Sequence, residues 1–137
     1  LKKLNLNNPV CHISYYEAYA FCQWAKCRLP SEEESEIYLN SLKNIKIKEN
    51  TILHSINSKQ NKNNLWWWTK SHYSSYPGYM PYNGILEEYN EKFMCNQFVL
   101  KGGSFATPSD HFRNTYRNFY EPHQRWMFSG IRVAKNI

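Results

Sequence analysis

The chain has 137 residues, of which 42% are hydrophobic and 17% aromatic, and a formal net charge of +6. This length suits one domain with one core, and the hydrophobic content argues against a disordered chain. The chain contains no run of about eighteen apolar residues, so we expect no membrane span. The surplus of lysine is spread along the chain, as is typical of a solvated surface. Nucleic-acid binding needs a basic stripe with stacking rings on one element. Residues 113–126 offer only part of that pattern, so we expect no nucleic-acid partner.

Two short helices are predicted near the start of the chain. In the stretch 14–26, Ser14 and Glu17 occupy the positions of a capping box, and apolar residues recur at helical spacing after them. A proline break follows, after which Ser31 and Glu34 repeat the capping pattern. Three glutamates in the first turn of this second helix suit the helix dipole.

Long loops are predicted between the helices and the end of the chain. Residues 44–64 are polar and rich in asparagine, which predicts a loop with one weak strand near 51–56. Proline, glycine and asparagine between 76 and 84 predict a second irregular stretch.

Strands are predicted at 65–69, 97–105 and 128–135 from their β-branched and aromatic residues. Because side chains alternate along a strand, we expect Trp66 and Trp68 to enter the core and Trp67 to lie on the opposite face, exposed for a partner. The sequence therefore predicts one α+β domain over 1–137, with two short helices, a small antiparallel sheet and many loops.

The cysteines predict free thiols. They form no CxxC pair and no zinc-ligand spacing, and Cys22 and Cys27 lie five positions apart across a helix end, a poor geometry for a disulfide. Free thiols are typical of a reducing compartment, so we expect a cytoplasmic protein.

Four stretches in their order resemble the formylglycine-generating-enzyme, or sulfatase-modifying-factor, superfamily. They are "PVCHISYYEAYAFCQWAKCRLPSEEE", "NLWWWTKSHYSSYPGY", "VLKGGSF" and "RNTYRNFYEPHQRWMFSGIRVA". Within the superfamily they are most similar to the C-terminal domain of the EgtB-type sulfoxide synthases of ergothioneine biosynthesis. The resemblance implies a C-type-lectin-like fold, of which this chain is the C-terminal part.

The resemblance also implies a reaction. EgtB-type enzymes are non-heme iron oxidoreductases that use O₂ to join trimethylhistidine to a cysteine-bearing thiol, giving a sulfoxide. Their helical domain binds iron(II) through an HxxxHxE-like motif, and none of the histidines of this chain lies in such a motif. We therefore expect this chain to bind no metal, and any iron(II) to come from a separate domain or a helical partner chain.

The chain departs from the family pattern at three places. Trp67 replaces the glutamate of a Trp-Glu-Trp motif, and Ser35 replaces a tryptophan after the Glu-rich helix start. Phe105 replaces the cysteine of Gly-Gly-Ser-Cys, and the last cysteine is Cys95. The paired thiols of formylglycine formation are therefore not expected here.

Residues 117–126 carry the predicted substrate contacts. Arg117 and Arg125 are fork-shaped donors suited to a carboxylate, although Arg117 also suits a structural role. Aromatic faces bind a quaternary ammonium by cation–π contact, and Phe119, Tyr120 and Trp126 supply such faces.

The resemblance places Phe119 and Tyr120 at substrate-facing positions and suggests Tyr89 as a catalytic proton donor. Two alternatives stay open beside the enzymatic reading. One is a non-enzymatic lectin-like module that binds a small ligand or a protein, and the other is an inactive, truncated relative. A truncated domain exposes core surface, so self-association is also expected.

Overall fold

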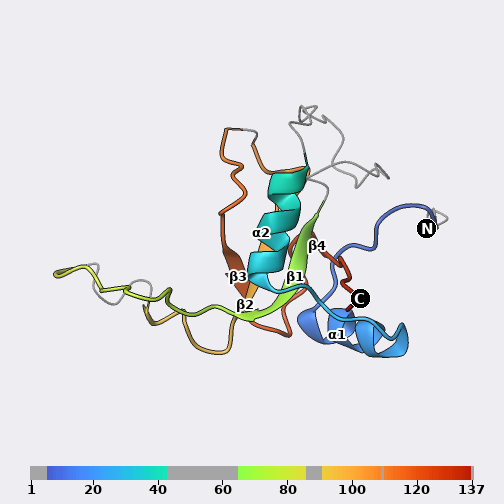
Figure 1. Cartoon of the computed structure of the whole chain (residues 1–137), viewed down its shortest axis with the longest axis horizontal. Coiled ribbons are helices and arrows are strands. Elements are labelled where there is room, and N and C mark those ends of the chain that lie inside the picture. Colours follow the sequence, from blue (N-terminus) through green and yellow to red (C-terminus); the bar gives the residue numbers. More distant parts are fainter. Residues whose placement is uncertain (1–5, 43–64, 86–90, 109, 137) are drawn as a thin grey trace.

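The computed structural model describes residues 6–42, 65–85, 91–108 and 110–136 (Figure 1). Within these ranges the chain forms two helices and one four-stranded sheet, which agrees with the predicted α+β class. Tyr89 and the whole predicted 44–64 loop with its weak strand lie outside the described residues. No helix in the described ranges is long and apolar enough to cross a membrane.

Both predicted helices are present and both begin with the predicted capping box. Helix α1 spans Tyr15–Trp24, and the Glu17 backbone N–H donates to Ser14 Oγ at 3.2 Å. Helix α2 spans Glu32–Ser41. Its Ser31 cap is built in the same way with Glu34. Each box satisfies backbone N–H groups that have no partner inside the helix.

The sheet has the strand order β3-β2-β1-β4. Its strands are β1 Trp66–His72, β2 Phe98–Gly102, β3 Asn118–Tyr120 and β4 Ser129–Gly130. Strand β2 pairs antiparallel with β1 and β3, but β4 pairs parallel with β1. The expected antiparallel sheet is therefore mixed, because the chain crosses from one sheet edge to the other between β3 and β4.

The predicted last strand at 128–135 is much shorter than expected. Only two of its residues join the sheet, and Ala134 instead forms an isolated bridge with Arg28. The alternation of Ile131, Arg132 and Val133 favours a strand locally. A strand also needs a neighbour in register, and β1 supplies one only at Trp66 and Trp67.

The two helices pack on opposite faces of the sheet. One face joins α1 in the main core, which includes Ala18, Cys22, Trp66, Trp68, Phe98 and Leu100. The other face carries residues of odd register, such as Trp67, Val99 and Lys101, and α2 lies along it (Figure 1). The alternation of side chains along β1 and β2 thus divides the interior into two layers.

The prediction of an exposed Trp67 was wrong. Its side chain is 4% exposed because α2 covers this face of the sheet. The indole Nε1 donates to Ser35 Oγ at 3.2 Å, and the Arg132 guanidinium lies 5.0 Å from the ring centroid. The family resemblance expects a tryptophan on the helix and a carboxylate on the strand. Here the two departures compensate each other, since the large ring sits on the strand and the small hydroxyl on the helix.

The thiols are free in the described residues, as predicted, but only Cys22 is fully buried. Burial, together with a hydrogen bond that the Cys22 S–H donates toward Cys27, raises the pKa of the Cys22 thiol to about 11. The cytoplasmic location expected from these thiols stays a prediction.

A surface ion pair at the start of α2 leads to a pH-dependent prediction. Arg28 Nη1 and Nη2 donate to the two Glu34 carboxylate oxygens at 2.6 and 2.7 Å, and this holds the pKa of Glu34 down at about 2. A lowered pKa gives stability that is present above the ordinary value and lost as the pH falls toward 2. Because the pair is partly exposed, its contribution to stability is small.

We expect Arg28→Gln to return the pKa of Glu34 toward its ordinary range. The stability difference between wild type and variant should narrow as the pH falls from about 4.5 to about 2. Carboxyl-carbon NMR titration of Glu34 and urea unfolding at several pH values measure both effects. An unchanged Glu34 titration in Arg28→Gln contradicts the assignment.

Candidate functional site

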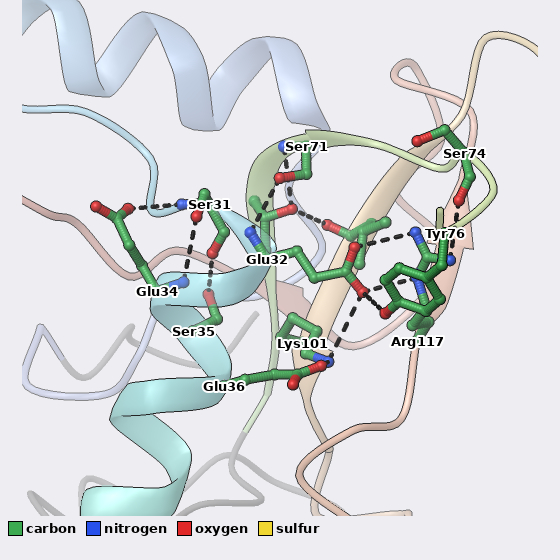
Figure 2. A network of polar contacts seen from close by, with 12 residues as sticks. Ser31, Glu32, Glu34, Ser35, Glu36, Ser71, Ser74, Tyr76, Lys101 and Arg117 are labelled. Atoms are coloured by element: carbon green, nitrogen blue, oxygen red, sulfur yellow. Dashed lines mark hydrogen bonds and ion pairs between the residues drawn. The ribbon is translucent and has the colours of Figure 1, made fainter. Parts of the chain in front are cut away.

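A network of charged side chains joins α2 to β2, β3 and the loop after β1. At its centre is Glu32 in the first turn of α2, whose carboxylate is almost fully buried. Arg117 Nε lies 2.7 Å from Glu32 Oε1, and Arg117 Nη2 donates to Oε2 at 3.0 Å. The Tyr76 hydroxyl also donates to Oε1, at 2.9 Å (Figure 2).

Lys101 on β2 completes this network. Its side chain is fully buried, and Nζ lies 2.6 Å from Glu36 Oε1 and 3.9 Å from Glu32 Oε1 (Figure 2). A buried ammonium group is tolerated only when it is paired and hydrogen-bonded. The two glutamates, one helical turn apart on α2, supply this pairing.

The guanidinium of Arg117 is held within the network, although its buried Nε lies close to Glu32 without forming a hydrogen bond. Besides Glu32, it donates from Nη1 to the Ser74 carbonyl at 3.0 Å. Its Cζ lies 4.8 Å from the ring centroid of Tyr73 and 4.3 Å from that of Tyr76. This geometry matches the structural role that the sequence left open for Arg117.

An aromatic pocket of about 230 Å³ lies where the ends of β1 and β3 meet the segment before β4. Its lining consists of Trp66, Ser104, Asn118, Tyr120, Trp126, Met127 and Phe128. Tyr120 and Trp126 meet edge to face, with ring centroids 5.1 Å apart and an interplanar angle of 80°. The Trp126 side chain is 67% exposed, so much of its surface is free for a ligand.

The two-residue period of β3 decides which side chains face this pocket. Asn118 and Tyr120 lie on one side of the strand and both line the pocket. Phe119 points to the other side, where its ring stacks on Tyr73 at 3.9 Å between centroids. Phe119 and Tyr120 therefore do not share one binding surface, although the sequence nominated both.

Of the nominated substrate contacts, the structure brings together Tyr120 and Trp126. Arg125 is exposed and donates from Nη1 to Glu17 Oε1 at 2.9 Å, and it is not among the residues that line the pocket. Asn118 was not nominated from the sequence, although strand alternation in Asn-Phe-Tyr would have paired it with Tyr120. The Asn118 Oδ1 accepts from the Phe119 backbone N–H at 3.0 Å. Its Nδ2 has no partner among the described residues.

A larger hollow of about 450 Å³ lies beside α2 and is lined by Glu32, Glu33, Glu36, Ile37, Asn40, Tyr76 and Thr115. Two of its three carboxylates already pair with Arg117 and Lys101. Its acidic character is therefore largely neutralised by the network.

The described histidines do not converge on a metal site. His12 lies against Phe128, His72 against Phe98 and His111 against Tyr116. His123 Nδ1 lies 3.5 Å from an oxygen of Glu121. Within the described ranges, no three metal-ligating side chains come together. The described residues therefore do not form an iron centre.

These features define a small α+β domain with an aromatic surface pocket. A family model described as the sulfatase-modifying factor enzyme 1-like domain matches residues 2–41 and 60–137. The chain therefore belongs to the sulfatase-modifying factor enzyme 1-like family, which confirms the superfamily predicted from the sequence.

Hercynine oxygenases are among the similar proteins. The enzyme of Mycobacterium tuberculosis is 28% identical over 161 residues, which cover 96% of this chain and 37% of the relative. Those of Mycolicibacterium thermoresistibile and Mycolicibacterium smegmatis are each 27% identical, and the match covers 36% and 38% of their lengths. The predicted EgtB-type resemblance is thus confirmed, and the chain spans little more than a third of these relatives.

Proposed function

We propose that this chain is the substrate-binding, C-terminal part of an EgtB-like sulfoxide synthase. The reaction is the iron(II)- and O₂-dependent formation of a carbon–sulfur bond between trimethylhistidine (hercynine) and a cysteine-bearing thiol. The iron belongs to a separate domain or partner chain, and the fold belongs to the C-type-lectin-like class. Family membership and the similarity to hercynine oxygenases support this proposal.

The aromatic pocket is the observation that carries the proposal. A trimethylammonium group cannot donate a hydrogen bond, so it is recognised by contact with aromatic faces. Tyr120, Trp126 and Trp66 surround the pocket from different elements and supply such faces. The ligand's cationic head lies in the pocket against the exposed Trp126 ring and beside Tyr120, since the two rings touch and leave no space between them.

The carboxylate of the same ligand needs donors close to the aromatic rings. Asn118 lines the pocket, and no described residue is bonded to its Nδ2, which can donate to the carboxylate. Arg125 precedes Trp126 in the chain, and its exposed pair with Glu17 is of the weak kind that a ligand carboxylate can displace. Arg117 serves indirectly, because its bonds to Glu32 and Ser74 hold β3 in place. Tyr89 stays the predicted proton donor.

Binding of trimethylhistidine should depend on the exposed ring of Trp126. We expect Trp126→Ala to weaken binding by about 2- to 30-fold, which corresponds to the loss of one cation–π contact of about 0.5–2 kcal/mol. Isothermal titration calorimetry of the chain with trimethylhistidine measures the change.

Two comparisons make this test specific. Trp24→Ala removes another exposed tryptophan that does not line the pocket, and binding should be unchanged. Histidine, which lacks the quaternary ammonium, should bind much more weakly to the wild type. Absence of heat with trimethylhistidine, with and without iron(II) and a helical partner, would overturn the proposal.

A non-enzymatic binding module is the second candidate. The observation that favours it is that the described histidines point to separate places and not to one centre. Binding of trimethylhistidine without turnover, in the presence of every iron-bearing partner tested, would favour this reading.

A further inference from the structure

The outward side of α1 is apolar and aromatic. Tyr16, Ala20 and Trp24 are spaced four residues apart, so they form one row along the helix, and all three are exposed. Tyr19 and Phe21 flank this row and are also exposed. The opposite side of the helix buries Ala18 and Cys22 in the core. Glu17 and Gln23 also lie beside the row, so the outward side is largely aromatic and carries two polar side chains.

This composition is unlike that of a helix that faces water. A surface helix carries charged residues opposite its buried stripe, whereas a helix that is apolar all round is a buried one. The chain contains twelve lysines, none of which lies in α1, and the helix carries one carboxylate, Glu17. Trp24, at the C-terminal end of the outward row, is 80% exposed.

The four exposed aromatic side chains of α1 present about 350 to 590 Å² of surface, if a whole aromatic side chain contributes about 150–250 Å². A patch of this size equals the largest patch of a typical monomer, and such patches mark interaction sites. A stable dimer needs about 800 Å² from each partner. Pairing of α1 with α1 of a second copy falls short of that area.

The similar proteins are much longer than the part that matches this chain. The match with this chain takes up only 36–38% of each hercynine oxygenase, so most of their polypeptide lies outside it. We infer that the outward face of α1 is a docking surface for a polypeptide equivalent to that remaining part. Its contacting face is largely apolar and places a bulky side chain over Ala20, between Tyr16 and Trp24. This inference rests on family membership and not on the proposed ligand.

A chimera tests the inference. Residues 1–137 replace the matching stretch of the Mycobacterium tuberculosis hercynine oxygenase, and Trp24→Lys is made both in the chimera and in the chain alone. We expect the Tm of the chimera to fall by at least about 5 °C, because a lysine is then forced into an apolar interface. The Tm of the chain alone should change by less than about 2 °C, because Trp24 faces water there.

Ile37→Lys is the matched control, since Ile37 is a 70% exposed apolar residue on the other helix. It should leave the Tm of both proteins within about 2 °C of the wild-type value. Equal effects of Trp24→Lys in chimera and chain would overturn the inference. So would a dimer of the chain alone that Trp24→Lys dissociates in sedimentation equilibrium, because a second copy would then be the occupant.

Co-expression replaces the chimera if the chimera is insoluble. The tagged chain is produced together with the unmatched part of the same oxygenase as a separate polypeptide. Co-purification that Trp24→Lys abolishes and Ile37→Lys retains supports the inference. Failure to co-purify, or equal recovery with both variants, overturns it. The readouts are stability and assembly, so failed binding of trimethylhistidine leaves the inference intact.

Discussion

Glu32→Gln is expected to lower the free energy of unfolding by about 3 kcal/mol or more, toward the range of about 3–5 kcal/mol for breaking a buried ion pair. The Glu32 carboxylate accepts from Arg117 and Tyr76 and lies within 3.9 Å of Lys101 Nζ. Glutamine keeps the size of the side chain but removes the charge. The fully buried Lys101 then keeps only Glu36 as a charged partner, and the Arg117 guanidinium loses the carboxylate that balances its charge.

Glu33→Gln provides the control for this prediction. Glu33 is the next residue of the same helical turn, and its side chain is exposed. The same substitution there should change stability by no more than about 0.5 kcal/mol. Urea unfolding followed by circular dichroism measures both variants. Equal stabilities of the two would show that the charge of Glu32 is not needed, and that hydrogen bonding alone holds the network.

The sequence predicted those parts of the fold that depend on near neighbours. Both capping boxes join residues three positions apart, so Ser14 with Glu17 and Ser31 with Glu34 were visible as patterns. The Glu32–Arg117 contact joins residues 85 positions apart, and nothing local to either residue indicates it. The length of strand β4 was predicted wrongly for the same reason. It depends on where β1 offers a pairing partner, which is not visible in the local sequence.

The candidate site was predictable in composition but not in geometry. The rings and arginines of residues 117–126 were visible, and Tyr120 and Trp126 do line one pocket. Arg117 and Phe119 face the other layer, because β3 alternates and because Glu32 and Tyr73 lie on that side. The burial of Trp67 depends on α2 crossing the sheet, which is a tertiary contact that strand alternation does not reveal.

Gly102 lies at the end of β2, and adding a single methyl group there is expected to lower the stability of the fold strongly. Its φ of +92° lies in a region that L-residues rarely adopt, and an added Cβ would lie 2.2 Å from Cζ3 of Trp67. Strained backbone costs about 1–2 kcal/mol and overpacking a further 1–3 kcal/mol. We therefore expect Gly102→Ala to lower the free energy of unfolding by about 2–5 kcal/mol, measured by urea unfolding.

Two further variants separate the contributions of backbone and packing. Gly78 has a φ of +80° with open space around its added Cβ, so Gly78→Ala isolates the backbone contribution of about 1–2 kcal/mol. Trp67→Leu in the Gly102→Ala background removes the clashing ring, so the two substitutions should be less harmful together than the sum of their separate effects. Additive losses would show that the Trp67 ring moves aside at little cost. In that case the close fit between β1 and Gly102 does not fix the position of the indole beneath α2.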